Sequence, residues 1–239
     1  PARQRESEIV ALLESARKTL SGGGSVLIPI FALGRMQEML FILDEAFRHE
    51  AIPPVPVFCS GLGMDLVNHF HQISKNSKDL RFNRRVLKEV GARPLPRKLQ
   101  AGRPLPMQGI YLVSSGMLVE NTPSYMLASS MLGDERNSIS FVGYCDPSTP
   151  GGKLLEAKPG ETFKFGEIDW TEQVKAKILQ FDMSGHADRE ELVAFAKKVS
   201  PKTIFLHHGD PESRKWFAKE LSGLGAKIID PEPLQIYET

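Results

Sequence analysis

Residues 26–38 read VLIPIFALGRMQE, and this stretch decides the fold. Its first six residues form a continuous apolar run, which is typical of a strand buried on both faces of a parallel sheet. Gly34 then interrupts the run, and residues 36–47 carry the apolar spacing of an amphipathic helix. A buried strand followed by a helix is the start of a βαβ unit, so we expect an α/β protein.

The same alternation continues on both sides of this stretch. Apolar residues at helical spacing predict a helix over residues 7–20, which ends at three successive glycines. Residues 74–108 look irregular, basic and rich in proline. Strands separated by helices favour a parallel sheet. Elsewhere the pattern predicts strands over residues 55–59, 110–113, 138–143, 175–181, 203–207 and 227–229, and helices over residues 65–73, 123–132, 153–157, 189–199 and 212–221.

The composition is that of an ordinary soluble globular protein, with 30 Lys plus Arg against 29 Asp plus Glu in 239 residues. Cys59 and Cys145 are the only cysteines, which excludes a disulfide scaffold and a cysteine-rich zinc knuckle. No apolar run could span a membrane and no signal peptide is visible, so we expect a cytoplasmic protein without a membrane partner. Because the chain begins with Pro1 rather than Met, we expect a fragment of a longer protein.

The net charge of the whole chain is close to zero, but residues 78–103 form a basic segment. It holds nine basic side chains against Asp79 and Glu89, so it carries +7, which leaves −6 on the rest of a chain whose net charge is +1. Such a segment could attract a polyanion. A solvated helix followed by a proline-rich loop explains the charge equally well.

Polar or glycine-rich loops follow several of the predicted strands. Ligands of parallel sheets bind beyond the carboxyl ends of the strands, so these loops form the candidate site. Gly34 and Arg35 suit a phosphate at a helix N-terminus, although a packing turn explains them as well. The loops at residues 114–117 and 144–152 could cradle an anion, or they could simply need glycine for their turns.

Histidines follow two more of these strands. His186 lies just before Asp188, which together with Glu191 predicts a helix capping box, and capping is the expected role of Asp188. Alternation along the strand predicted at residues 203–207 would point His207 and His208 to opposite faces, so at most one enters the site. A single loop histidine is usually an ordinary surface residue, whereas a second one at a parallel strand end makes a paired site plausible.

In this order the five loops resemble the β-CASP branch of the metallo-β-lactamase superfamily, which contains zinc-dependent nucleases such as RNase J and the cleavage and polyadenylation endonuclease. The likeness covers nearly the whole chain. It implies an α/β fold with a parallel-sheet β-CASP domain over residues 1–159. Residues 160–239 would be the returning C-terminal part of a metallo-β-lactamase αββα sandwich. The motifs that carry it are residues 23–43, SSGML at 114–118, residues 137–144, SGHAD at 184–188 (motif B) and LHHGD at 206–210 (motif C).

The resemblance also implies roles for single residues. His208 stands at the metal-ligand position of motif C, and His186 would act at the scissile phosphate. DNA-processing members usually carry valine where His208 stands, so the expected substrate is RNA, in single-stranded form. The nucleic-acid backbone would be held by Arg35, Ser114, Ser115, Gly116 and Thr149.

The sequence departs from the family pattern in two ways. Ser148 stands where many relatives have glycine, and the His-x-His-x-Asp-His half of the metal site is absent. His69 and His71 cannot replace it, because neighbours at i and i+2 of a predicted helix diverge. Since zinc needs at least three protein ligands, we expect this chain alone to bind the two zinc ions of the complete enzyme weakly or not at all, and to be inactive.

The missing N-terminal half is therefore an expected partner. Its absence should expose an apolar face over residues 175–237, which a homodimer could bury. We expect a fragment of a zinc-dependent RNA hydrolase. The alternative is a non-catalytic RNA-binding or scaffold member of the same family, which the retained His186 and His208 disfavour. An unrelated nucleotide-binding protein is disfavoured because no Gly-x-Gly-x-x-Gly or Walker-type sequence follows a predicted strand.

Overall fold

The computed structural model describes residues 5–77, 82–96, 99–183 and 185–237. The chain forms two compact units, Pro1–Met183 and Ser184–Thr239. Among the described residues, no helix is long and apolar enough to cross a membrane. The domain boundary expected after residue 159 stays a prediction, because compactness and family relationship need not divide a chain at the same residue.

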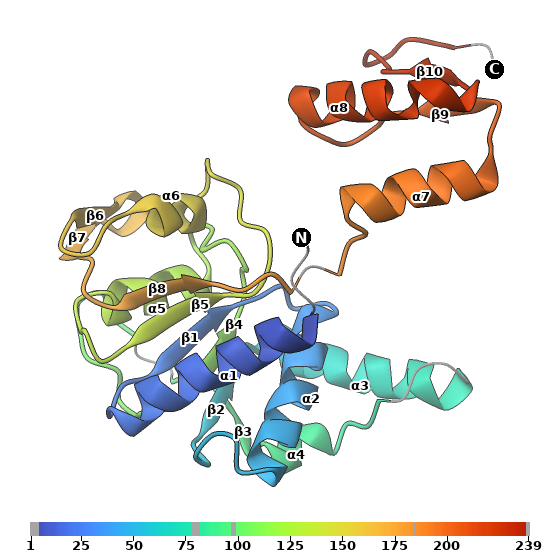
Figure 1. The fold of residues 1–239 in the computed structure, drawn as a ribbon. Helices are drawn as coiled ribbons and strands as arrows, with labels where there is room; N and C mark the ends of the chain where they lie inside the picture. Colours follow the sequence, from blue (N-terminus) through green and yellow to red (C-terminus); the bar gives the residue numbers. More distant parts are fainter. Residues whose placement is uncertain (1–4, 78–81, 97–98, 184, 238–239) are drawn as a thin grey trace. The chain divides into compact units, whose positions relative to one another are not determined.

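The first unit is built on a six-stranded sheet in which every neighbouring pair of strands is parallel (Figure 1). The parallel α/β architecture expected from the alternating pattern is therefore confirmed. All four residues of its central strand β1 (Val26–Pro29) are buried, as the continuous apolar run predicts. In sheet order the strands are β3 (Ala92–Pro94), β2 (Val57–Cys59), β4 (Ile110–Val113), β1 (Val26–Pro29), β5 (Ser138–Phe141) and β8 (Lys177–Gln180).

Helices cover both faces of this sheet, and alternate residues of each strand enter one of two cores. Val26 and Ile28 of β1 enter the core under the first four helices, whereas Leu27 enters the opposite core. The first face carries α1 (Arg5–Ser21), α2 (Arg35–Arg48), α3 (Gly61–Asn76) and α4 (Val86–Glu89). The opposite face carries α5 (Pro123–Met131), α6 (Pro150–Glu156) and the antiparallel hairpin of β6 (Thr162–Phe165) and β7 (Trp170–Gln173), joined by the short η1 (Gly166–Ile168).

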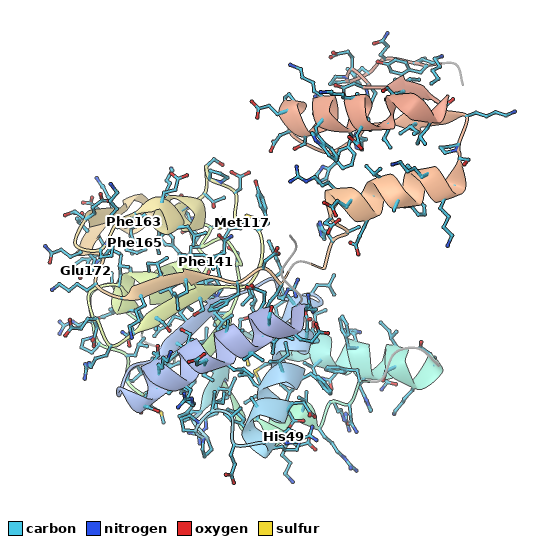
Figure 2. All side chains as sticks on the ribbon, viewed as in Figure 1. His49, Met117, Phe141, Phe163, Phe165 and Glu172 are labelled. Atoms are coloured by element: carbon cyan, nitrogen blue, oxygen red, sulfur yellow. The ribbon has the colours of Figure 1, made fainter. Side chains whose placement is uncertain are left out.

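The hairpin closes the second core with aromatic rings. Phe163 and Phe165 of β6 lie 5.0 Å apart between ring centroids, and they share that core with Phe141 of β5 (Figure 2). The sequence pattern missed this hairpin, and the expectation that residues 74–108 are irregular was wrong where α4 and β3 form. All these elements span only three or four residues, which is too short for hydrophobic periodicity to mark them.

The second unit contains α7 (Arg189–Val199), β9 (Thr203–Phe205), α8 (Pro211–Leu221), the short η2 (Ser222–Leu224) and β10 (Lys227–Ile229). β9 and β10 pair in parallel across α8, as the βαβ pattern predicts. Val193, Leu221 and Ile229 are its buried residues of large apolar type. Other apolar side chains of α7 stay exposed, which agrees with the apolar face expected in this part of the chain.

The glycines before β1 supply the first testable prediction. A Cβ on Gly24 would lie 1.8 Å from the backbone oxygen of Arg136 in the loop before β5, whereas a Cβ on Gly22 would meet nothing closer than 3.4 Å. Gly24→Ala should therefore lower the free energy of unfolding of the first unit by about 1–3 kcal/mol, as overpacking does. Gly22→Ala is the matched control and should leave it nearly unchanged.

Urea denaturation followed by the fluorescence of Trp170, in a Trp216→Phe background, measures both changes in the first unit. Equal stability of the two alanine variants would contradict the close approach of Gly24 to the β5 loop.

Candidate functional site

Three loops meet at the carboxyl edge of the sheet in the first unit. β1 lies between β4 and β5 and is parallel to both, so the loops after these strands emerge at one edge. A Cβ on Gly116, after β4, would lie 3.2 Å from the ring of Phe31, which follows β1. The N–H of Gly151, after β5, donates to the carbonyl of Met117 at 2.9 Å. The three loops therefore lie side by side, because they follow adjacent parallel strands.

Arg35 begins α2, directly after Gly34, whose φ of 79° lies in the left-handed region that glycine adopts freely. The Nη1 atom of Arg35 lies 2.5 Å from a carboxylate oxygen of Glu38, and Arg5 of α1 pairs with the other oxygen. Burial lowers the pKa of Arg35, and the charge of Arg5 lowers it further. A guanidinium remains charged at neutral pH all the same. Glu38 therefore holds a fixed cation at the start of the helix.

The loop after β4 uses its serines to hold its own shape. The Ser115 hydroxyl accepts a hydrogen bond from the N–H of Val119 at 2.9 Å. Ser124 donates its hydroxyl to the Ser115 carbonyl at 2.8 Å and its N–H to the Ser114 carbonyl at 3.0 Å. The roles expected for Ser114 and Ser115 at the nucleic-acid backbone stay predictions.

Thr149 in the loop after β5 caps α6. Its hydroxyl donates to the carbonyl of Asp146 at 2.6 Å and accepts from the N–H of Gly152 at 3.2 Å. Hydrogen bonds from the hydroxyl and the N–H of Ser148 lower the pKa of Asp146. The Thr149 proton is thus committed within the loop, and Ser148, which departs from the family pattern, takes part in ordering it.

Asp188 caps the first helix of the second unit, as expected. Its carboxylate accepts from the N–H of Glu191 at 2.8 Å, and the Glu191 carboxylate accepts from the N–H of Asp188 at 2.9 Å. His186 lies two residues before this cap and is exposed. Ser184 of the same motif lies outside the described residues.

His207 and His208 lie in a loop, because β9 ends at Phe205. The expected alternation of the two histidines along a strand is therefore wrong. Both are exposed, with ring centroids 6.3 Å apart, and His208 has a φ of 62°. Arg214 orders this turn, because it donates to the carbonyl of Gly209 and bonds the Asp230 carboxylate at 2.7 Å.

The ligands present do not complete a zinc site. In the part of the chain that the structure describes, no group of three or more His, Cys, Asp or Glu side chains could hold a metal ion. His208 and His186 are two donors at most, and a protein zinc site needs at least three. Their assignment as metal ligand and catalytic residue stays a prediction.

The structure adds contacts that the sequence did not reveal. Glu8 of α1 is buried, and its carboxylate accepts from the N–H of Asp182 at 2.8 Å. Arg5 donates to the carbonyl of Met183 at 2.9 Å. The first turn of α1 therefore fixes the chain directly after β8, just before the segment that carries His186. The spacing of Arg35 and Glu38 on one helix was a usable signal for their pair, whereas nothing local marks a contact between residues this far apart.

Removal of the Thr149 hydroxyl should weaken the cap of α6. Thr149→Val should lower the free energy of unfolding of the first unit by about 1 kcal/mol, the usual contribution of an N-cap side chain. Thr149→Ser keeps the hydroxyl and serves as the control. Chemical denaturation of the three proteins measures the effect. A valine variant as stable as the parent would mean that the hydroxyl is free for a ligand.

Two family models match the chain: the Beta-Casp domain over residues 36–154, and the Zn-dependent metallo-hydrolase RNA specificity domain over residues 171–231. The chain is 33% identical over 230 residues to transcription termination factor FttA of Methanothermobacter thermautotrophicus, covering 88% of this chain and 34% of that protein. It is 26% identical over 213 residues to Integrator complex subunit 11 of Gallus gallus (87% and 34%), and 27% identical over 208 residues to an RNase J-like protein of Methanocaldococcus jannaschii (83% and 46%).

The chain thus spans between a third and a half of the length of these relatives. The parallel sheet is consistent with the match to the Beta-Casp domain, and the second family model matches the C-terminal part of the chain. The chain belongs to the β-CASP family of the metallo-β-lactamase superfamily.

Proposed function

We propose that this chain is part of a zinc-dependent RNA-processing nuclease that hydrolyses phosphodiester bonds. The observation that carries the proposal is the presence of His186 and His208 at their motif positions inside the matched RNA specificity domain. The names of the relatives, a transcription termination factor and an RNase J-like protein, support RNA as the substrate class. Single-stranded RNA is the form we propose.

We assign His208 to the metal shell and His186 to the scissile phosphate. A histidine imidazole can donate a proton to the leaving oxygen or offset its negative charge. The described residues hold no three-ligand group, so the further zinc ligands would come from outside them. By this proposal the chain alone binds zinc weakly or not at all and does not cleave RNA.

The missing half of the metal site is the proposed partner of the second unit. Leu192, Phe195 and Val199 lie on one stripe of α7, and all three are exposed. An upstream segment of the complete protein would cover this stripe, and a homodimer is the proposed substitute in the isolated chain. The alternative function is a non-catalytic RNA-binding or scaffold protein, which the retained His186 and His208 disfavour.

The nuclease proposal is tested in the protein joined to its N-terminal metal-binding half. Cleavage of single-stranded RNA should require zinc and stop on chelation. His208→Ala should lower the zinc content measured by mass spectrometry. His186→Ala should keep the zinc while slowing cleavage by about 100-fold or more, the usual effect of losing a general acid.

His207→Ala is the matched control and should change neither quantity. Activity that survives complete zinc removal would contradict the proposed chemistry. Loss of zinc from the His186 variant would overturn the division of roles between the two histidines.

The basic segment gives a separate prediction about RNA binding. Arg84, Arg85, Lys88 and Arg93 are exposed, while Lys78, Arg81, Arg97 and Lys98 lie outside the described residues. Reversing the charges of Arg84 and Arg85 to Glu should weaken binding of single-stranded RNA. It should also flatten the slope of log K against log salt by about 1.4 if each side chain contacts one phosphate.

Charge reversal of Arg17 and Lys18, an exposed adjacent pair on α1, is the control. Fluorescence anisotropy over a salt series measures both affinity and slope. If the two double variants bind equally well, residues 78–103 are a solvated surface and nothing more.

A further inference from the structure

Large apolar side chains are exposed at the carboxyl edge of the sheet, beside the loops of the candidate site. Two of them are aromatic: Phe31 after β1 is 51% exposed, and Tyr144 after β5 is 64% exposed. Apolar side chains gathered at one exposed place usually mark an interaction site. Leu33 after β1, Leu62 after β2 and Val119 after β4 are exposed at the same edge.

The backbone around both rings is fixed. The Phe31 ring packs on one side against Gly116, where a Cβ would approach it to 3.2 Å, and the Phe31 carbonyl accepts from the N–H of Met36. Before Tyr144, the Gly143 carbonyl accepts from the side chain of Gln180 at 3.0 Å. Because β1 and β5 are adjacent and parallel, the two rings follow neighbouring strands. Each ring thus stands on an ordered backbone.

The polar groups at this edge are mostly used within the protein. Thr149 donates its hydroxyl proton to Asp146, and Ser124 donates its own to Ser115. The edge therefore presents two exposed rings and the Arg35 guanidinium, whose side chain is 17% exposed and held by Glu38, rather than a row of free donors. Aromatic rings next to a cation are the chemistry that binds single-stranded nucleic acids, whose bases stack while their phosphates are attracted.

Charge favours this occupant over an apolar protein surface. The Arg35 cation begins α2 four residues after Phe31, at this same edge, and would attract a polyanion. A duplex would not fit the rings, because its bases are already stacked and paired. The surface therefore suits unpaired RNA.

We propose that Phe31 and Tyr144 are stacking platforms for two unpaired bases of a single-stranded RNA, with Arg35 facing its backbone. The proposal rests on the RNA-directed function proposed above. It adds the residues that favour unpaired over paired RNA.

The test is binding of a labelled single-stranded RNA oligonucleotide to this chain, measured by anisotropy across a salt series. Phe31→Leu and Tyr144→Leu keep an apolar side chain but lose the ring, and each should weaken binding by about tenfold or more, as loss of one stacked base does. The slope against log salt should not change. Arg35→Gln should instead flatten that slope by about 0.7, the effect of one lost phosphate contact.

Phe195→Leu on α7 is the matched control, since this phenylalanine is 66% exposed but belongs to the second unit, and it should bind like the parent. Phe31→Trp and Tyr144→Trp should retain binding, and the new indole should be quenched by the oligonucleotide. An oligonucleotide without bases should bind more weakly to the parent chain and should quench neither indole.

The outcomes separate this proposal from the proposed function. RNA binding that is unaffected by both leucine variants overturns the stacking platforms and leaves the RNA-directed function intact. Absence of RNA binding by the parent chain overturns the stacking platforms, whereas the RNA-directed function is decided by cleavage in the protein joined to its N-terminal half. Equal losses for single-stranded and duplex RNA overturn the stacking model. A changed oligomeric state with unchanged RNA affinity would make the patch a protein contact and also overturn it.

Discussion

The parallel pairing of β1 with β4 on one side and β5 on the other is the constraint on which the rest of the structure depends. Parallel strands end at the same edge of the sheet. The strand pairing alone therefore brings together loops that lie far apart in the sequence. The pairing requires that the chain before β1 approach the loop before β5 closely. Gly24 permits this, and the Asn137 side chain accepts from the N–H of Ser25 at 2.8 Å. Gly24, at the amino edge of the sheet, thereby helps to position the loops of the candidate site at the carboxyl edge.

The site loops also show why a motif and a ligand contact are different things. Thr149 and Ser115 resemble substrate-binding residues of the family, yet the hydrogen bonds seen for them order their own loops. A buried or half-buried polar group must find a partner, and a loop that supplies one internally holds its shape without a ligand. Loss of activity on mutating such a residue would therefore not by itself identify a contact to RNA. Stability has to be measured alongside binding.

The sequence was informative where one element carries its own signal. The apolar run of residues 26–31 and the helix pattern after Gly34 were sufficient for β1 and α2, and the Asp188–Glu191 capping box is local to four residues. Prediction from the sequence failed where an element is very short or where two contacting residues lie far apart in the chain. β6 and β7 have four residues each, so their alternation is too brief to stand out. The pairing of Glu8 with Asp182 joins positions 174 residues apart, and no local pattern encodes it.

That distant contact fixes the end of the sheet's last strand in the first unit. Burial of a carboxylate is unfavourable unless hydrogen bonds compensate it. The buried carboxylate of Glu8 accepts one such bond from the backbone N–H of Asp182. Arg5 divides its guanidinium between the Met183 carbonyl and Glu38, and Glu38 also holds Arg35. The end of β8 and the cation of the candidate site are thus fixed to the same turn of α1. Within the first unit, the chain therefore leaves β8 at a point set by Arg5, which also pairs with the carboxylate that orients Arg35.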